Sequence, residues 1–274
     1  MYPVLFKIGR FELHSYGVML AAAFAVSVFL AVKRGQKVGF TFSQIYDITI
    51  VVIFSSLIGS RMAYVVLHFD EFRGRMWDII NPIQSNGQIG ISGMVQLGGV
   101  VFAIAAVIIY VRIKSLSLGK VSDVLTPSLA IGIAIGRIGC FLNGCCFGKP
   151  CDLPWAVKFP PGSFAHYAYN DTAVHPTQLY AVFYALLIFI ILTIVDKKKP
   201  FHGFNLALFM ILYGIARYIN ESLRYYEGSE SGMVLIKIFE VGITFSQIIS
   251  IALVLAGLII IITRTRSFSF GKEK

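Results

Sequence analysis

The chain has 274 residues, of which 57% are hydrophobic and 14% are charged, and its formal net charge at pH 7 is +10. Soluble domains carry about 25% charged residues, so this composition excludes an ordinary soluble protein. Apolar runs of about 18–22 residues recur along the chain, and runs of that length cross a bilayer as helices. The sequence therefore predicts an all-α, polytopic membrane protein.

Seven apolar runs are long enough to be membrane spans. They are Tyr16–Val32, Ile45–Leu67, Met94–Val111, Val124–Asn143, Gln178–Val195, Asn205–Tyr218 with a polar extension, and Ile243–Thr263. No small-residue cleavage site follows the first run, so we expect the first helix to be retained. We expect one integral membrane domain over residues 1–274.

Short motifs precede several of the spans. Residues Val4–Leu13 alternate around Gly9, which predicts a hairpin or an interfacial segment. Thr41–Gln44 has the pattern of a capping box before the second span, and the same four letters recur at Thr244–Gln247. We interpret these as two local helix starts and not as a repeat, because no longer self-similarity accompanies them.

Three arginines lie inside otherwise apolar spans: Arg61 in the second, Arg137 in the fourth and Arg217 in the sixth. Each arginine costs roughly 2.5–3.5 kcal/mol at the centre of a bilayer on insertion scales. An arginine in such a position is therefore a functional hypothesis.

The other lysines and arginines divide unequally between the two ends of the spans. Thirteen lie at one set of ends: Lys33, Arg34, Lys37, Arg112, Lys114, Lys120, Lys197, Lys198, Lys199, Arg264, Arg266, Lys272 and Lys274. Eight lie at the other set: Lys7, Arg10, Arg73, Arg75, Lys149, Lys158, Arg224 and Lys237. The positive-inside rule then places the N-terminus outside and the C-terminus in the cytoplasm. This topology accounts for the basic charge, so we expect no nucleic acid partner.

The predicted topology places the three arginines at one depth. Each lies roughly 20–24 Å from the cytoplasmic end of its span, in an apolar core about 30 Å thick. Snorkelling to the outer interface explains a single arginine in that position. Three at similar depth favour a shared pocket for an anionic group close to the outer surface.

The fourth span ends in a cysteine-rich segment. Gly132 and Gly136 surround Arg137 with small residues, and the four cysteines between Cys140 and Cys151 are spaced C-x4-C-C-x4-C. This spacing differs from the usual zinc patterns, so we expect no metal. A disulfide of Cys145 or Cys146 with Cys151, inert buried thiols, and a thiolate activated by Arg137 all remain open.

The longest connection, Gly144–His175, precedes the fifth span. Its four prolines and an alternating patch at Trp155–Phe159 predict a small extracytoplasmic cap with a short strand pair. His175 and Gln178 follow at the outer mouth of the span, three residues apart. His175 there is either a cap or hydrogen-bond partner, or a base.

The sixth span places polar residues along one helical stripe: Tyr213, Arg217, Glu221 and Arg224. Two interpretations are open. Arg217 and Glu221 form an ion pair that neutralises itself, or Glu221 orients an arginine whose planar fork binds a phosphate.

Taken together, these motifs resemble the bacterial prolipoprotein diacylglyceryl transferases. The similarity covers nearly the whole chain. It comprises Ser15–Gly17, Gly59–Arg61, Gly93–Gly99, Gly136–Gly148 against the signature G-R-x-G-N-F-x-N-x-E-x-x-G, His175–Tyr180, and Leu212–Glu221.

The resemblance implies an enzyme that transfers diacylglyceryl from phosphatidylglycerol to the lipobox cysteine of a prolipoprotein and releases glycerol phosphate. It implies no cofactor, a multi-pass protein of the bacterial cell membrane, and a monomer. Arg137 and Arg217 would stabilise the leaving phosphate, and Tyr213 and Glu221 would orient Arg217. The substrate-binding residues would be Arg137, Tyr16, Arg61, Asn143, Gly148, His175 and Gln178.

The chain departs from the family pattern at three positions. It has Leu97 where a histidine is usual, Cys140 in place of asparagine and Cys145 in place of glutamate. Leucine cannot accept a proton, so His175, Glu221 or Cys145 takes over the role of base, or the thiol loses its proton in another way. The alternatives in other classes are a non-catalytic lipid-binding or transport protein and a membrane thiol–disulfide enzyme that uses the Cys140–Cys151 cluster.

Overall fold

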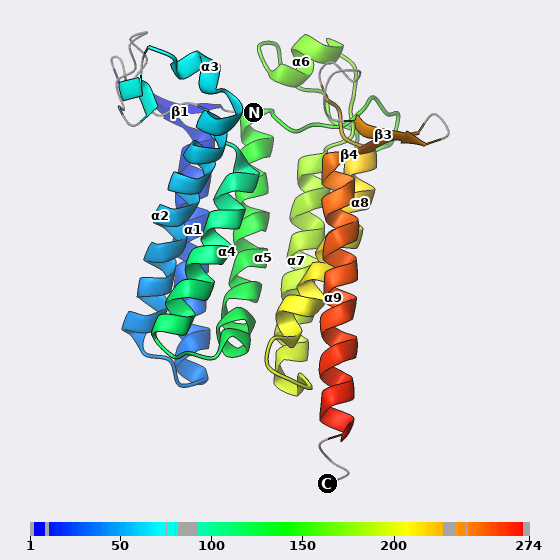
Figure 1. Ribbon diagram of the computed structural model, residues 1–274. Coiled ribbons are helices and arrows are strands. Elements are labelled where there is room, and N and C mark those ends of the chain that lie inside the picture. Colours follow the sequence, from blue (N-terminus) through cyan, green and yellow to red (C-terminus); the bar gives the residue numbers. More distant parts are fainter. Residues whose placement is uncertain are drawn as a thin grey trace. The chain divides into compact units, whose positions relative to one another are not determined.

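The structure is a computed structural model that describes residues 3–8, 11–74, 76–79, 81, 93–226, 234–238 and 241–270. The chain forms two compact units, and Figure 1 labels their helices and strands. The first comprises Met1–Arg34 and Ser122–Lys274, and the second comprises Gly35–Val121.

Helices dominate both units. The long helices of the first unit are α1 (Ser15–Lys37), α5 (Leu118–Asn143), α7 (Thr177–Val195), α8 (Phe204–Ser222) and α9 (Phe245–Phe270). The second unit contains α2 (Phe42–Leu67), α3 (Phe69–Phe72), η1 (Met76–Ile79) and α4 (Gln96–Ile113). Each of the seven predicted spans therefore coincides with a helix.

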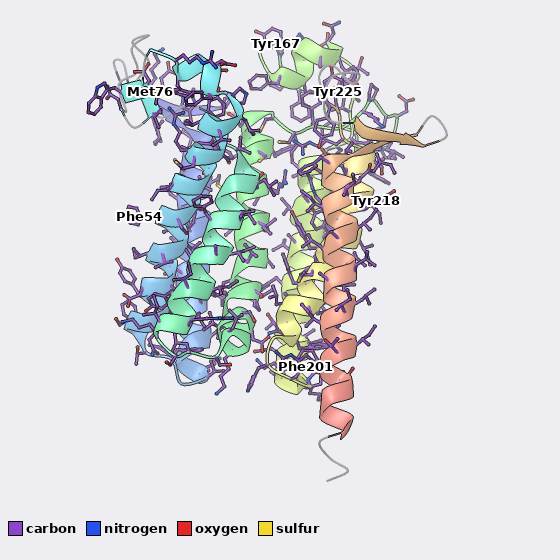
Figure 2. The ribbon with its side chains drawn as sticks, in the orientation of Figure 1. Phe54, Met76, Tyr167, Phe201, Tyr218 and Tyr225 are labelled. Carbon is purple, nitrogen blue, oxygen red and sulfur yellow. The ribbon has the colours of Figure 1, made fainter. Side chains whose placement is uncertain are left out.

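Six helices among the described residues are long and apolar enough to cross a membrane: α1, α2, α4, α5, α7 with the short η2 (Asp196–Lys198), and α9. Large apolar side chains lie exposed along them: Phe54 is 59%, Phe183 72% and Ile259 60% exposed, and Phe54 projects outward from α2 in Figure 2. Such surfaces are stable in lipid and not in water. The chain is thus a polytopic, all-α membrane protein.

Two β-hairpins precede helices of the first unit. The predicted N-terminal hairpin is confirmed as β1 (Val4–Ile8) paired antiparallel with β2 (Phe11–His14), directly before α1. A second hairpin, β3 (Val234–Ile238) with β4 (Val241–Thr244), directly precedes α9. Their pairings correspond residue by residue, including an irregularity after the first pair. This hairpin–helix unit is a longer internal similarity than the sequence analysis found.

Both predicted capping boxes are present. The Thr41 hydroxyl accepts from the Gln44 backbone while the Gln44 side chain accepts from the Thr41 backbone. Thr244 and Gln247 form the same reciprocal pair at the start of α9. Each box satisfies two of the backbone N–H groups that a helix start leaves without partners.

The first unit packs around an apolar core and a charged cluster. Ala130 of α5, Ile188 and Leu192 of α7, and Phe209 of α8 form the core. Near the start of α8, Lys199 lies 3.0 Å from both Asp123 and Asp196, and Arg34 lies 2.9 Å from Asp196. Asp123 also accepts hydrogen bonds from the backbone of Gly203 and Asn205. The cluster connects α1, α5, η2 and α8.

The connection between α5 and α7 is built differently from the predicted strand pair. It contains the short helix α6 (Phe164–Tyr169) and single bridges of Val174 with Pro150 and Val157. Phe147, Phe159 and Val174 form a small apolar core beneath it, to which Tyr225 from the segment after α8 adds a stacked ring 5.3 Å from Phe147. This packing joins the exits of α5 and α8.

Candidate active site

The first functional group of the site is the guanidinium of Arg137. Arg137 of α5 is partly buried, and no hydrogen bond or ion pair engages its guanidinium in the part of the chain that the structure describes. Tyr184 of α7, Tyr213 of α8 and the thiols of Cys140 and Cys146 lie within its electrostatic range. A buried arginine requires a counter-charge or hydrogen-bond acceptors. The position is therefore suited to an anionic ligand.

A second cationic group lies on α8. Arg217 Nη2 is 2.8 Å from Glu221 Oε2, and Arg224 Nη1 is 3.9 Å from the same oxygen. The Tyr226 hydroxyl donates a hydrogen bond to the other oxygen of Glu221. Burial, and then this bond, raise the pKa of Tyr226, so the phenol stays protonated at neutral pH. One carboxylate is therefore shared by two arginines.

Arg137 and Arg217 both lie within electrostatic range of one residue of α7, Tyr184. The guanidinium groups of Arg137 and Arg217 both act electrostatically on the Tyr184 hydroxyl, and the ring centroids of Tyr184 and Tyr213 are 6.0 Å apart. Arg217 and Arg224 share the single carboxylate of Glu221, and Arg137 adds a third guanidinium near Tyr184, so the guanidinium groups outnumber the carboxylate. Nη1 of Arg217 is buried without a hydrogen-bond partner among the described residues. This donor is free to bind a ligand.

Sequence reasoning missed Tyr184. The available signal was a hydroxyl in the middle of the apolar fifth span, where polar groups require partners. The predicted stripe of Tyr213, Arg217, Glu221 and Arg224 does form on α8, and the ion pair of Arg217 with Glu221 is confirmed, while the binding of a phosphate by Arg217 stays a prediction. Arg217 is paired with Glu221, but that pair does not neutralise Arg224 or Arg137.

Three cysteines cluster where α5 ends. The Sγ atoms of Cys140, Cys145 and Cys146 all lie within 4.8 Å of one another, and all four cysteines are free thiols. Arg224 Nη2 donates to Cys146 Sγ at 3.1 Å. Hydrogen bonds from the Cys140 and Cys145 thiols, together with the charges of Arg224 and Arg137, hold the pKa of Cys146 far below its ordinary value. Cys151 lies outside this cluster.

Two buried residues at the start of α7 hold the backbone of this cluster. Thr177 Oγ1 donates to the Cys146 carbonyl at 2.6 Å, and Gln178 Nε2 donates to the Cys145 carbonyl at 2.7 Å. Cys146 has φ +63°, a conformation that few residues other than glycine adopt. The tight turn therefore depends on tertiary hydrogen bonds.

Three further predicted residues lie around the cluster. Tyr16 of α1 is within electrostatic range of its thiols and of Arg137, and the Asn143 side chain hydrogen-bonds to the Cys145 thiol. Gly148 lies behind the turn, where its N–H donates to the His175 carbonyl at 2.9 Å. A Cβ on Gly148 would lie 2.7 Å from the Leu223 carbonyl oxygen, so the position requires glycine.

The structure gives separate partners to His175 and Gln178. His175 Nδ1 lies 3.1 Å from the Tyr180 hydroxyl, in agreement with the hydrogen-bonding interpretation of this histidine. Gln178 is fully buried against the Cys145 carbonyl. Gln178 thus supports the thiol cluster rather than facing the same ligand as His175.

Arg61 is engaged within the second unit. Its Nε donates to the Ile79 carbonyl at 2.9 Å, Nη2 to the Asp78 carbonyl at 2.6 Å and Nη1 to the Gly93 carbonyl at 3.3 Å. Its guanidinium also lies 5.1 Å from the Phe72 ring centroid. Arg61 therefore joins η1, which follows α2, to Gly93, which precedes α4, and each of its three guanidinium nitrogens makes a hydrogen bond to a backbone carbonyl.

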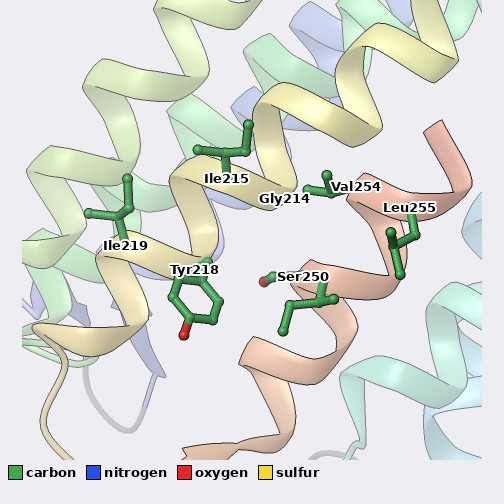
Figure 3. Close-up of a pocket in the computed structure, with 8 residues that line it drawn as sticks. Gly214, Ile215, Tyr218, Ile219, Ser250, Val254 and Leu255 are labelled. Carbon is green, nitrogen blue, oxygen red and sulfur yellow. The ribbon is translucent and has the colours of Figure 1, made fainter. Parts of the chain in front are cut away.

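A groove between α8 and α9 is distinct from this site (Figure 3). Its lining is Gly214, Ile215, Tyr218, Ile219, Ser250, Ile251, Val254 and Leu255. None of these residues carries a charge, so the groove offers an apolar surface and cannot bind a phosphate by ion pairing.

Fold and site together define a polytopic helical membrane protein in which Arg137 and the shared Arg217–Glu221–Arg224 group adjoin a cluster of thiols. The sequence model of the prolipoprotein diacylglyceryl transferase family matches residues 3–263, and the chain belongs to this family.

Curated relatives match over nearly the full length. The chain is 31% identical to a protein of Clostridium tetani, over 95% of this chain and 96% of the relative. It is 29% identical to a protein of Finegoldia magna over 99% of each chain, and 31% identical to a protein of Campylobacter hominis over 93% of this chain and 88% of the relative. All three relatives are named phosphatidylglycerol–prolipoprotein diacylglyceryl transferase.

Proposed function

We propose that this chain transfers the diacylglyceryl group of phosphatidylglycerol to the lipobox cysteine of a prolipoprotein. The thiol sulfur attacks the glyceryl carbon that carries the phosphate ester. The carbon–oxygen bond breaks, a thioether forms, and glycerol phosphate leaves with that oxygen. The proton of the thiol passes to the released phosphate or to solvent, so the reaction is balanced without a redox partner.

The observation that carries this proposal is that Arg137, which has no ion pair or hydrogen bond within the described part of the chain, acts on the same Tyr184 hydroxyl as Arg217 of the shared Arg217–Glu221–Arg224 group. A phosphodiester has one negative charge, and the departing monoester develops a second. The three guanidinium groups outnumber the Glu221 carboxylate and the Cys146 thiolate, so the site keeps a net positive charge that can stabilise the developing phosphate charge. Preorganised donors that face developing charge stabilise a transition state more than a ground state.

The other predicted residues take supporting roles in this proposal. Tyr213 lies beside Arg137, and Glu221 fixes the orientation of Arg217. Tyr16 and Asn143 border the space next to the thiols, while Gly148, His175 and Gln178 shape its walls through backbone and side-chain hydrogen bonds. In this proposal Arg61 is assigned no contact with the phosphate, because each of its three guanidinium nitrogens already donates to a backbone carbonyl of its own unit.

We further propose a seventh span and a topology. The helix α8 packs along α7 and α9, and its 19 residues extend about 28 Å, close to the thickness of a bilayer core. Its polar residues face the site and lower its mean hydropathy. With the N-terminus outside and the C-terminus in the cytoplasm, residues 144–175 form an extracytoplasmic cap. The protein then acts as a multi-pass monomer of the bacterial cell membrane.

The test is a reconstituted reaction. Purified protein in detergent is incubated with phosphatidylglycerol and a lipobox peptide, and the peptide mass is measured. We expect a gain of one diacylglyceryl group on wild type, and no gain on a peptide whose lipobox cysteine is serine. The Clostridium tetani relative, treated identically, is the positive control. No thioether from this chain while the relative forms it would refute the proposal.

A further inference from the structure

The thiol cluster has the dimensions of a metal site. Three protein sulfurs around tetrahedral zinc, each about 2.3 Å from the metal, lie about 3.8 Å from one another. The Sγ atoms of Cys140, Cys145 and Cys146 are already within 4.8 Å, so side-chain adjustments of about 1 Å bring them to that geometry. The expectation of no metal rested on the spacing of the cysteines along the chain, and that spacing does not show that three sulfurs come together in the fold.

Hydrogen bonds from neighbouring residues hold the backbone of the thiol cluster in place. The carbonyls of Cys145 and Cys146 accept hydrogen bonds from Gln178 and Thr177, which are 0% and 2% exposed. The Cys145 N–H donates to the Cys140 carbonyl at 3.1 Å. Outer contacts of this kind orient metal ligands and are part of a working site. These bonds hold the backbone from which the three side chains extend, and the Sγ atoms lie within 4.8 Å of one another.

Charge balance favours a divalent cation at that point. Three thiolates with Zn²⁺ carry a net charge of −1, and Arg224 already donates to Cys146 at 3.1 Å. Arg137 adds a second positive charge within electrostatic range. Soft thiolate ligands select zinc over hard cations such as magnesium or calcium.

The ligand count indicates a site with an open position. Among the described residues the group contains three cysteines and no fourth histidine, cysteine or carboxylate. Structural zinc sites are closed by four protein ligands, whereas catalytic sites have three and leave one position for water or substrate. A thiol that coordinates zinc loses its proton, and the thiolate is the nucleophilic form.

We propose that Cys140, Cys145 and Cys146 bind one zinc ion whose fourth position takes the lipobox thiol. This inference rests on the proposed function, because that reaction needs a thiolate next to the phosphate site. The bound sulfur attacks the glyceryl carbon, the carbon–oxygen bond breaks, and the product leaves the metal as a neutral thioether, which is a weak ligand. The thiol proton is released on binding and ends on glycerol phosphate or in solvent. Leu97 cannot supply a base, and this arrangement needs none at that position.

Metal content gives the first test. Wild type purified without chelator is expected to carry one zinc per chain by elemental mass spectrometry. Cys151→Ser is the matched control, because this cysteine lies outside the cluster, and it is expected to retain the zinc. Cys145→Ser and the double variant Cys140→Ser/Cys145→Ser are expected to lose at least tenfold in zinc occupancy. Absence of metal from wild type, full occupancy in the double variant, or a disulfide within the cluster would overturn the proposal.

A spectroscopic test does not depend on variants that fold poorly. Cobalt(II) added to chelator-treated wild type is expected to give a thiolate-to-cobalt charge-transfer band in the near ultraviolet. A lipobox peptide should change the band, and the same peptide with serine should not. No band, or one that is indifferent to both peptides, would contradict the open fourth position.

Activity measurements distinguish a failure of the zinc site from a failure of the proposed transferase function. Removal of zinc should slow thioether formation at least tenfold, and added zinc should restore it. An unchanged rate in metal-free wild type overturns the zinc site and leaves the transferase intact. Zinc bound at the three thiols, with no thioether under any metal condition, contradicts the transferase and with it the substrate thiol as fourth ligand.

Discussion

Arg217 Nη2 lies 2.8 Å from Glu221 Oε2, one helical turn away on α8, and that oxygen is also 3.9 Å from Arg224 Nη1. The Glu221 carboxylate is buried, and its single negative charge cannot neutralise both guanidinium groups. A shared counter-ion fixes the direction of Arg217 without cancelling the positive field. The pair therefore positions a cation and leaves it able to bind phosphate.

Replacing Glu221 with Gln tests this positioning role. The amide keeps the shape but loses the charge, so Arg217 turns away from its orientation. We expect thioether formation to slow by about 10²-fold, the loss that a displacement of about 1 Å can cause. Initial rates at saturating phosphatidylglycerol measure it. Tyr226→Phe is the control, because it removes one hydrogen bond and retains the carboxylate, and it should slow the reaction less than tenfold. Equal effects in the two variants would contradict the role.

Arg137→Gln should separate activity from stability. Its guanidinium has no partner among the described residues, so the substitution removes no native ion pair, and the thermal unfolding temperature in detergent should not fall. The loss of a donor to the leaving phosphate should lower kcat by about 10²–10³-fold. A variant that unfolds at a lower temperature in proportion to its lost activity would show that Arg137 is structural.

Arg61→Gln should instead lower stability and leave the binding of phosphatidylglycerol unchanged. It removes donors from the carbonyls of Asp78, Ile79 and Gly93, and each hydrogen bond to a charged group contributes about 1.5–3 kcal/mol. We expect a lower unfolding temperature, with KM for phosphatidylglycerol unchanged in the folded fraction. A raised KM with unchanged stability would return Arg61 to the substrate site.

Local sequence patterns were sufficient to predict the long helices of this fold, but they did not predict the contacts that form the site. Apolar runs and capping residues identify α1, α2 and α9, because those signals act within a few turns of chain. The helix α6 was missed, since six residues are too few to show a period. The hairpin repeat is visible in the sequence as VLFKI and VLIKI, but only the four letters shared by Thr41–Gln44 and Thr244–Gln247 were noted in the sequence analysis.

The site depends on approaches between helices that no spacing reveals. The stripe on α8 was predictable because its members follow helical periodicity. The convergence of Cys140 with Cys145 and Cys146 depends on Thr177 and Gln178, about thirty residues downstream, which hold the turn from α7. Tyr184 becomes part of the site only because the fold brings its hydroxyl within electrostatic range of both Arg137 and Arg217. Sequence distance carries no information about these contacts.

The charged cluster of Asp123, Asp196 and Lys199 gives a prediction about alkaline pH. Burial opposes the charge on Lys199, but its hydrogen bonds to Asp123 and Asp196 outweigh burial and raise its pKa above the ordinary value of 10.5. A lysine whose pKa is raised on folding stabilises the native state fully below pH 10.5. That contribution is lost as pH rises through the folded-state pKa.

Lys199→Met should therefore be less stable than wild type at pH 8, by about 3 kcal/mol, because it leaves a buried carboxylate without its cation. The difference should shrink once the pH exceeds 10.5, since wild type then loses the same charge. Unfolding midpoints of both proteins in detergent between pH 8 and pH 12 measure the difference, and tyrosine ionisation affects both alike. A difference that stays constant across this range would mean that Lys199 contributes through packing of its side chain and not through its charge.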